Sequence, residues 1–390
     1  MNRQEIRVAH VATIDMTVRV LLMPQLRALR EAGYAVTAIS APGEFAEEIE
    51  AEGIAFLPWV NATRAWDPWS DLRAFAELGA ILRRGGFHLV HTHNAKPGVM
   101  GRIAARLVGV PCVVNTIHGF DATPDDPPRR RVAFMGLEWM AAQFSDMELF
   151  QGRSDLLRAK RLAMKAPSKT RFIGNGTDLT RFRPDAVVQQ QREALRRDLG
   201  IPDEAPVVGM VGRLVAEKGY RELFAAAPKV KALVPEARFL VVGERDEAKA
   251  DGITDVEMKR AEGDGVTFLG WRADMPELFS TMDVFTLPSW REGVPRSAIE
   301  AAATGLPMVL SDIPGCRQVC RPNIDGFLVP ARDPVALAGA LRTLLADEDL
   351  RTRMGASARR HAEAHFDERD VVRRVLEVYD GVLRRKRIGR

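Results

Sequence analysis

The sequence predicts an α/β protein made of two doubly wound, Rossmann-like domains. Its 390 residues are too many for one ordinary hydrophobic core. Short apolar segments alternate with longer amphipathic ones, which is typical of parallel sheets covered by helices. The alternation stops at the polar stretch Arg183–Pro206 and restarts directly after it. Two domains, each with its own sheet, are the simplest account of these three observations.

The first half contains six short apolar runs of strand length, with helical patterns between them. The expected strands are Ile6–Ile14, Tyr34–Ser40, Phe87–His91, Val113–Ile117, Met147–Phe150 and Thr170–Ile173. The clearest expected helices are Arg19–Ala32, Asp71–Arg84 and Gly98–Val108. Gly33 and Gly109 follow two of these helices, where a residue that tolerates left-handed geometry is favoured.

The second half repeats the pattern with five strand candidates. These are Val207–Val211, Arg238–Val242, Val266–Leu269, Val284–Leu287 and Met308–Leu310. We expect an N-terminal domain over residues 1–180, a C-terminal domain over 181–365, and a final segment over 366–390 whose helix can cross back to the first domain. Ligands of such sheets bind at the carboxyl ends of the strands, so two facing domains imply a binding cleft.

The cysteine content and the apolar runs indicate a cytoplasmic protein. Three cysteines cannot form a disulfide framework, and no apolar run approaches the ~20 residues that span a bilayer. No signal-peptide pattern is present at the start of the chain. Cys316 and Cys320 have no nearby histidine, so we expect them to pack in the core and expect no metal site.

The net charge of +4 is small, but basic residues are clustered. Arg129–Arg131 precede an apolar, Trp-containing stretch, and the tail carries Arg384, Arg385, Lys386, Arg387 and Arg390. With Trp59, Trp66, Trp69 and Trp139, these clusters agree with peripheral contact with an anionic membrane at its inner face. A solvated helix face and a frayed tail remain the alternative. We expect no nucleic-acid partner.

The first candidate site follows the strand Val207–Val211. Gly212 allows close approach of a ligand to the backbone, Arg213 can bind phosphate oxygens with its fork of donors, and Lys218 adds a point charge. The next helix offers free N–H groups to an anion. The segment lacks both the dinucleotide fingerprint and the P-loop pattern. The alternative is an ordinary turn with exposed charges.

The second candidate site is Glu292-Gly293-Val294-Pro295-Arg-Ser-Ala-Ile-Glu300. Pro295 suits the first turn of a helix, which places Glu292 in the preceding loop and Glu300 about two turns along. Glu292 alone could simply complement the helix dipole. That alternative leaves Glu300 unexplained, because its alanine neighbours look buried and a buried carboxylate needs a partner.

In combination, these segments resemble the family-4 retaining glycosyltransferases of the GT-B fold. The resemblance covers nearly the whole chain, and each fragment is weak alone. Its fragments, in family order, are His91-Thr-His93-Asn, Thr116-Ile-His118-Gly119-Phe120, Asn175-Gly-Thr-Asp178, Gly212-Arg213 with Lys218, Phe268-Leu-Gly-Trp271, Glu292-x7-Glu300, Gly305-Leu-Pro307 and Asp325-Gly326.

The resemblance implies a nucleotide-sugar donor and a role for each matching residue. Arg213 and Lys218 would neutralise the departing diphosphate, and Glu300 would hold the ribose hydroxyls. Glu292 would bind the transferred sugar, with the backbone of Gly293, Val294 and Pro295 near the phosphates. Trp271 and Arg272 would frame the nucleobase, and His118 would lie across the cleft near the reacting carbon. The family needs no cofactor, because the nucleotide sugar is a substrate.

The loop after the first strand departs from the family pattern. Many relatives have a Gly-Gly pair where this chain has Thr13-Ile-Asp15-Met-Thr-Val-Arg19. Arg19 is therefore expected to meet an anionic acceptor, together with Lys96 of Lys96-Pro-Gly98. These segments most resemble capsule, O-antigen and exopolysaccharide enzymes. Their acceptors are often lipid-linked sugars, and a UDP-sugar is the expected donor.

Two other functions compete with sugar transfer. A nucleotide-sugar epimerase has the same two-domain architecture but acts on the donor alone. A two-domain sugar-binding protein would use the cleft without chemistry, although Arg213 and Lys218 argue for a diphosphate ligand. A dehydrogenase is disfavoured by the missing glycine fingerprint.

Overall fold

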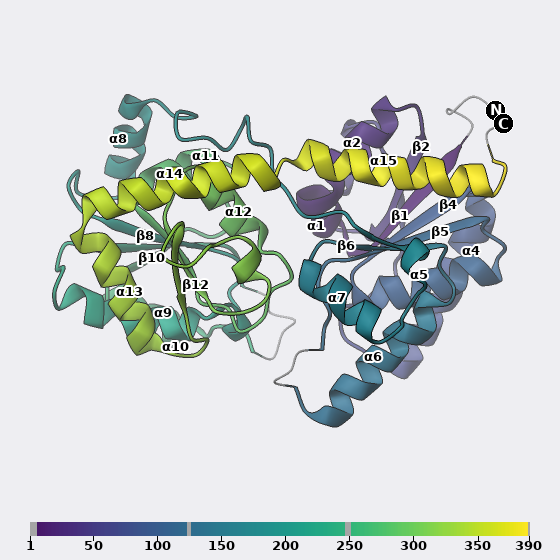
Figure 1. Ribbon diagram of the computed structural model, residues 1–390, viewed down its shortest axis with the longest axis horizontal. Coiled ribbons are helices and arrows are strands. Elements are labelled where there is room, and N and C mark those ends of the chain that lie inside the picture. The colour runs from purple at the N-terminus through teal and green to yellow at the C-terminus, as the bar shows by residue number, and fades with distance from the viewer. Residues whose placement is uncertain (1–5, 123–125, 246–250, 389–390) are drawn as a thin grey trace. The chain divides into compact units, whose positions relative to one another are not determined.

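The computed structural model describes residues 6–122, 126–245 and 251–388. The chain forms two compact units (Figure 1). The N-terminal unit runs to Gly174 and takes in the residues from Arg369 onward, and the C-terminal unit is Asn175–Glu368. Arg390 of the basic tail lies outside the described residues.

The N-terminal unit is built on a seven-stranded parallel sheet in the order β3-β2-β1-β4-β5-β6-β7. Its strands are β1 (Arg7–Ile14), β2 (Ala35–Ala41), β3 (Ala55–Pro58), β4 (Leu89–His93), β5 (Cys112–Ile117), β6 (Met147–Phe150) and β7 (Thr170–Phe172). Its helices are α1 (Asp15–Thr17), the π-helix η2 (Val18–Leu22), α2 (Met23–Glu31), α3 (Ala46–Ala51), α4 (Pro68–Gly85), α5 (Ala95–Leu107), α6 (Pro128–Ala142), α7 (Arg153–Arg161), the 3₁₀ turn η3 (Pro167–Lys169) and α15 (Glu368–Arg385).

The C-terminal unit has a six-stranded parallel sheet in the order β10-β9-β8-β11-β12-β13. Its strands are β8 (Val207–Val211), β9 (Arg238–Val242), β10 (Val266–Phe268), β11 (Val284–Leu287), β12 (Met308–Ser311) and β13 (Gly326–Val329). Its helices are α8 (Gln189–Asp198), η4 (Ala216–Lys218), α9 (Tyr220–Lys231), α10 (Asp255–Gly263), α11 (Met275–Thr281), α12 (Arg296–Ala303), η5 (Cys316–Gln318), α13 (Pro334–Ala346) and α14 (Glu348–His365).

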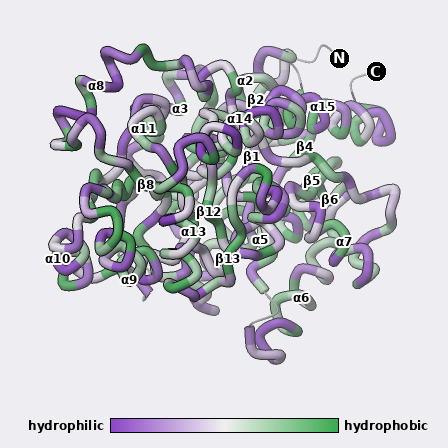
Figure 2. The backbone as a smooth tube through the Cα atoms, turned by 60° about the vertical axis from the view of Figure 1, so that its left-hand side comes forward, coloured by the Kyte–Doolittle hydropathy of each residue, from purple (hydrophilic) through white to green (hydrophobic). Residues whose placement is uncertain are grey.

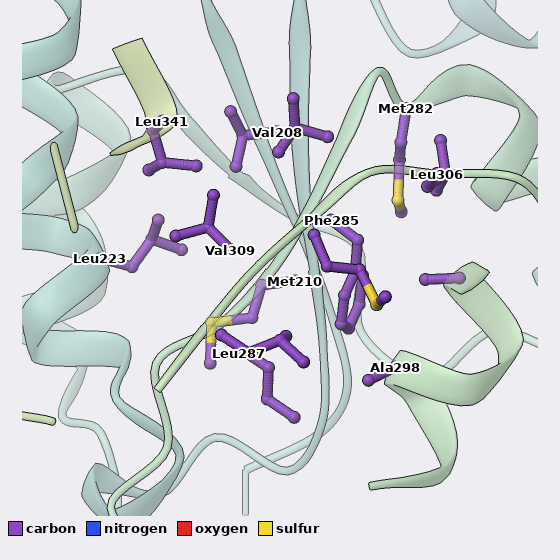
Figure 3. Close-up of a cluster of buried hydrophobic side chains, with 14 of the residues drawn as sticks. Val208, Met210, Leu223, Met282, Phe285, Leu287, Ala298, Leu306, Val309 and Leu341 are labelled. Carbon is purple, nitrogen blue, oxygen red and sulfur yellow. The ribbon is translucent and has the colours of Figure 1, made fainter. Parts of the chain in front are cut away.

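Apolar side chains from both faces of the second sheet form the core of the C-terminal unit. Figure 3 shows Met210 and Leu287 from the strands, Leu223 from α9 and Leu341 from α13 in this core. Ala298 of α12 packs on it as well. Because both faces are covered, the strands are continuously apolar rather than alternating.

The two faces of the first sheet pack against different helices. One face, with Ala9 and Val11 of β1, contacts α4 and α5. The other, with Val8 and Ala12, contacts α2 and the last helix, α15. Hydrophilic and hydrophobic residues alternate along α15 (Figure 2), as expected for a helix with one buried stripe. The buried residues of α15 are Val375, Val378, Tyr379, Val382 and Leu383.

The predicted fold class is confirmed, and every predicted strand is present to within two residues at each end. Two strands, β3 and β13, were missed: β3 ends in a proline and β13 begins with a glycine, and both residue types weaken a strand pattern. The helix expected to start at Arg19 begins at Asp15 and contains the π-helical turn η2. The boundary between the two units falls after Gly174, before the polar stretch that begins at Arg183.

Candidate functional site

The strand orders create one reversal point in each sheet. In the first sheet, β2 and β3 lie on one side of β1, and β4 to β7 lie on the other side. In the second sheet, β9 and β10 lie on one side of β8, and β11 to β13 lie on the other side. Ligands of open parallel sheets bind outside the carboxyl ends of the strands at such a point. Arg213 follows β8, and Glu292 follows β11. The predicted donor residues therefore gather where this architecture places a ligand.

Lys218 and Glu292 form the centre of this candidate site. The Lys218 ammonium donates to Glu292 Oε1 at 2.6 Å, and the Ser289 hydroxyl donates to the same oxygen at 2.7 Å. The Glu292 side chain is nearly buried. Two segments that are 74 residues apart in the sequence are thus joined by a charge-assisted hydrogen bond. Glu292 Oε2 is not used in these contacts.

Arg213 lies beside the pair in a small charged cluster. Its guanidinium is 3.8 Å from Glu217 Oε1, and Arg291 approaches Glu217 Oε2 at 3.1 Å. Arg213 remains more than one-third exposed, so its donors can reach a ligand. Lys218, Arg213 and Arg291 against Glu217 and Glu292 leave an excess of positive charge, which favours an anion.

Two glycines allow the loops of the site to approach each other. Gly219 has φ +85°, and a Cβ there would lie 2.1 Å from the Pro288 carbonyl oxygen at the end of β11. A Cβ on Gly315 would lie 2.0 Å from the Gly293 carbonyl oxygen. Both distances are far below van der Waals contact. The backbone next to Lys218 and next to Glu292 can reach its position only without these side chains.

Glu300 lies on α12, with an arginine one turn before it. Arg296 Nε donates to Glu300 Oε1 at 3.0 Å. Burial raises the pKa of Glu300, and the charge of Arg296 opposes that effect. Pro295 is the N-cap of α12 rather than a residue of its first turn, because its ψ of 115° is extended. The Val294 carbonyl accepts from Asn175 Nδ2 at 2.9 Å.

Trp271 and Arg272 follow β10 at the edge of the same unit. Trp271 is about half exposed, and Arg272 Nε donates to Asp274 Oδ1 at 2.8 Å. A cavity of about 310 Å³ opens beside Asp274, lined also by Thr180, Arg181 and Glu277. Its walls include none of the predicted donor residues. Donor binding at the carboxyl ends of β8 and β11 therefore stays a prediction from the chemistry of their side chains.

The predicted acceptor residues Arg19 and Lys96 belong to the N-terminal unit. Arg19 lies in η2, is partly exposed and pairs with Glu48 at 2.5 Å. Lys96 is buried, forms an ion pair with Asp71 and donates to Thr63 Oγ1 at 2.8 Å. In this conformation Lys96 fastens the loop before α4, and its role in acceptor binding stays a prediction.

His118 directly follows β5 and belongs to a cluster of four histidines. His10 on β1 is the register partner of His91 on β4, and His93 lies on the same face of β4 two residues later. His93 Nδ1 is 3.1 Å from His118 Nε2. Burial lowers the pKa of His118 to about 4 and that of His10 to about 3. All four rings are therefore neutral near pH 7.

Sequence reasoning missed this cluster. His118 was considered alone, and only the cysteines were considered as metal ligands. Among the described residues, His10, His91 and His93 have ligand atoms within 4.8 Å of one another, a spacing that a metal ion also fits. The available signal was the pair His91-x-His93, because residues two apart on a strand share a face.

The tryptophans divide between the core and the surface. Trp59 is 1% exposed and its indole N–H donates to the Ala74 carbonyl at 2.8 Å, so its expected membrane contact is wrong. Trp69 is 78% exposed, and Trp66 and Trp139 are about half exposed. The Trp66 ring packs edge-on against Phe134 of α6, which carries Arg129–Arg131. None of the described helices has the length and apolarity of a membrane span.

Comparisons with known proteins give a consistent result. The family model "Glycosyl transferases group 1" matches residues 191–361, and "Glycosyl transferase 4-like domain" matches residues 17–147. The chain is 32% identical over 319 residues to UDP-Gal:alpha-D-GlcNAc-diphosphoundecaprenol alpha-1,3-galactosyltransferase of Escherichia coli, which covers 80% of this chain and 79% of that protein.

A second relative and a solved structure extend the match over almost the whole chain. The N,N'-diacetylbacillosaminyl-diphospho-undecaprenol alpha-1,3-N-acetylgalactosaminyltransferase of Campylobacter jejuni is 26% identical and covers 93% of this chain and 95% of its own. A crystal structure of Anabaena HepE in complex with UDP and glucose aligns with a TM-score of 0.80, at 20% identity, over 96% of this chain and all of that one. Together these matches support sugar transfer over the epimerase and the sugar-binding protein.

Proposed function

Because this chain is a glycosyltransferase of group 1, we propose that it moves a sugar from a UDP-sugar to a saccharide linked to undecaprenyl diphosphate. The product would be an intermediate of a bacterial surface polysaccharide. The main structural support is the Lys218–Glu292 pair at the reversal point of the second sheet. The name of the Escherichia coli relative supports the UDP-sugar donor, and the names of both relatives support the acceptor class.

The proposed donor contacts follow from the chemistry of each group. The diphosphate accepts from Arg213, Lys218 and the backbone N–H groups of Gly293 and Val294, before α12, and Gly212 lets the ligand approach the backbone closely. Glu292 accepts from hydroxyls of the transferred sugar through the oxygen that Lys218 leaves open. Glu300 accepts from the ribose hydroxyls, with Arg296 partly balancing its charge. Trp271 and Arg272 border the nucleobase.

In the proposed reaction, the bond between the anomeric carbon and the phosphate oxygen breaks, and the diphosphate gains negative charge. Arg213 and Lys218 stabilise that charge because they are already in place and need no reorganisation. The acceptor hydroxyl attacks the same face of the sugar, and its proton passes to the departing phosphate. Glu292 therefore acts by binding and needs no role as a base. His118 is the residue proposed to contact the reacting sugar.

The proposed acceptor is anchored in a membrane, and an aromatic and basic surface suits such a substrate. Trp66 and Trp69 precede and begin α4, and Trp139 lies on α6 with Arg129–Arg131 at its start. Exposed tryptophans beside arginines match the polarity of a lipid headgroup region. We propose peripheral binding to anionic lipid through this surface, with Arg19 and Lys96 near the acceptor diphosphate.

Release of UDP tests this function directly. The purified chain should release UDP from a UDP-sugar only when a diphosphoundecaprenol-linked saccharide is added. Glu292→Ala should lower UDP release by about 100-fold or more, because the sugar loses a hydrogen-bond partner in the transition state. Glu236→Ala, at an exposed carboxylate before β9, is the matched control and should keep full activity. Equal UDP release by both variants would refute the assignment.

A further inference from the structure

A buried chain of hydrogen bonds connects the last helix to His118. The Tyr379 hydroxyl of α15 is 3.1 Å from His10 Nε2. His10 Nδ1 is 3.0 Å from His93 Nε2, and His93 Nδ1 is 3.1 Å from His118 Nε2. Tyr379, His10 and His93 are almost completely buried, so water does not compete for these contacts. The first of these hydrogen bonds joins Tyr379 to His10, which lie 369 residues apart in the sequence.

A branch of the same network leaves from the same hydroxyl. Tyr379 Oη is 2.7 Å from His91 Nδ1, and His91 Nε2 is 2.7 Å from Thr116 Oγ1. The Gln25 amide lies 3.4 Å from His91 Nδ1. Every ring nitrogen of His10, His91 and His93 therefore has a hydrogen-bond partner.

Two arrangements of the protons give each of these hydrogen bonds one donor and one acceptor. A neutral imidazole has one N–H and one bare nitrogen, and a tyrosine hydroxyl has one proton to donate. If Tyr379 donates to His10, then His10 donates through Nδ1 to His93, and His93 donates through Nδ1 to His118. Tyr379 must then accept from His91 Nδ1–H, while Thr116 donates to His91 Nε2. All four rings carry their proton on Nδ1.

The second arrangement reverses every bond. Tyr379 donates to His91 Nδ1, and His10 donates to Tyr379 through Nε2. His93 and His118 then also donate through Nε2, so all four rings carry the proton there. Gln151, which hydrogen-bonds His118, fits either pattern because its amide can donate or accept. Any mixture of tautomers either leaves a buried N–H or hydroxyl without a partner or places two lone pairs against each other at hydrogen-bond distance, and both are costly.

We propose that Tyr379, His10 and His93 are positioning residues that hold the four histidines in one common tautomer and so decide which nitrogen of His118 carries the proton. The effect on catalysis rests on the proposed role of His118. A histidine that contacts a substrate presents a donor or a bare nitrogen according to its tautomer, and its neighbours normally fix that choice. Here the neighbour at the far end of the chain is a hydroxyl on α15.

A metal ion is the competing occupant of the three-histidine cluster. Zinc would need bare nitrogens about 2.0–2.1 Å from the ion. The 3.0 Å contact between His10 Nδ1 and His93 Nε2 instead has the length of an N–H···N hydrogen bond. The filled hydrogen-bond inventory therefore favours the tautomer chain.

The test is NMR of the full chain with ¹⁵N-labelled histidine. The seven histidines are assigned with single His→Gln variants. Two-bond proton–nitrogen correlations then report which nitrogen of each ring is protonated. The expected result is one shared tautomer for His10, His91, His93 and His118. Mixed tautomers among these four in the wild type, or stoichiometric zinc in the purified protein, would overturn the proposal.

Two tyrosine-to-phenylalanine substitutions, at Tyr379 and at Tyr34, supply the test variant and its control. Tyr379→Phe keeps the buried ring but removes the shared hydroxyl, so His91 and His10 should no longer share a tautomer and His118 should populate both. Tyr34→Phe removes a hydroxyl that donates to Asp380 of the same helix at 3.1 Å, and it keeps the ring that packs edge-on against Tyr379. It should leave all four histidines unchanged. A Tyr379→Phe protein with an unaltered shared tautomer would contradict the coupling.

Kinetics separate this proposal from the proposed function. Tyr379→Phe should lower kcat by about two- to tenfold through the wrong tautomer of His118, with the KM for the UDP-sugar unchanged. Tyr34→Phe should leave both constants unchanged. A fully active His118→Asn would refute the proposed role of His118 alone, whereas the NMR result decides the shared tautomer whatever the activity. An equal loss of kcat in the two tyrosine variants would show a merely structural role.

Discussion

At the scale of single residues, the Lys218–Glu292 pair combines a structural contact with a proposed role in binding. A buried carboxylate needs a cation or several donors, and Glu292 has the Lys218 ammonium and the Ser289 hydroxyl. The same lysine is then in place for a phosphate. One contact therefore serves the stability of the unit and its proposed chemistry.

Lys218→Ala is expected to lower kcat/KM by about 100-fold or more, since it removes a charge that stabilises the departing diphosphate and leaves Glu292 without its cation. Lys229→Ala removes an exposed lysine from α9 and serves as the control. Steady-state kinetics of UDP release measures both. If the two variants differ by less than about threefold, then Lys218 does not contact the leaving group.

At the scale of elements, the sequence predicted the two sheets because buried parallel strands are continuous apolar runs. It also placed Arg213 and Glu292 after strands, which is enough to put them at the same edge of a parallel sheet. The proline that ends β3 and the glycine that begins β13 hid these two strands. The convergence of His10 with His91 depends on the pairing of β1 with β4, which no local pattern encodes.

The turn before α9 gives a prediction at this scale. Gly219→Ala combines a strained positive φ with a clash against the Pro288 carbonyl, so it should shift Lys218 and destabilise the protein by about 1–3 kcal/mol. Gly200→Ala has a similar φ of +66° but meets nothing within 4 Å, so it carries the backbone strain alone. Chemical denaturation and the KM for the UDP-sugar compare the two. An unchanged KM in Gly219→Ala would separate this turn from donor binding.

The strands β1 and β4 give a second prediction through their histidines. Burial lowers the pKa of folded His10 to about 3, whereas the unfolded residue titrates near its ordinary 6.5. Below about pH 6.5 the unfolded state binds more protons, so stability falls as the pH falls. At pH 5 His10 alone should cost about 2 kcal/mol of unfolding free energy.

Urea unfolding at pH 7.5 and pH 5.0 measures this loss. His118, whose pKa is lowered to about 4, should add a similar amount. His365→Gln, at an exposed position on α14, should keep the full pH dependence, and His10→Gln should reduce it. Equal unfolding free energies at the two pH values in the wild type would contradict the neutral, buried state of the cluster.

At the scale of the whole molecule, α15 ties the end of the chain to its beginning. Five of its side chains are buried against the N-terminal unit, and Tyr34 bonds Asp380 across 346 residues of sequence. Each buried side chain of this size contributes about 1.5–3 kcal/mol, so the helix supplies a large share of that unit's stability. The C-terminal unit is one continuous segment.

Removing the residues after Asp367 should therefore unfold the N-terminal unit and spare the other. Calorimetry of the truncated chain is expected to show a single transition, and hydrogen exchange should place the protected amides within residues 175–367. Substituting exposed Arg373 of α15 by alanine is the control and should preserve the complete profile. Two intact transitions in the truncated chain would show that the helix is dispensable.

The same connection sets an order of events during protein synthesis. The C-terminal unit has all of its residues before α15 leaves the ribosome, whereas the N-terminal unit, although made first, waits for the last residues to be translated. Contacts so distant in sequence form slowly. The half of the enzyme that is synthesised first is therefore the half that matures last, and a prematurely terminated chain leaves its apolar surface open to chaperones and proteases.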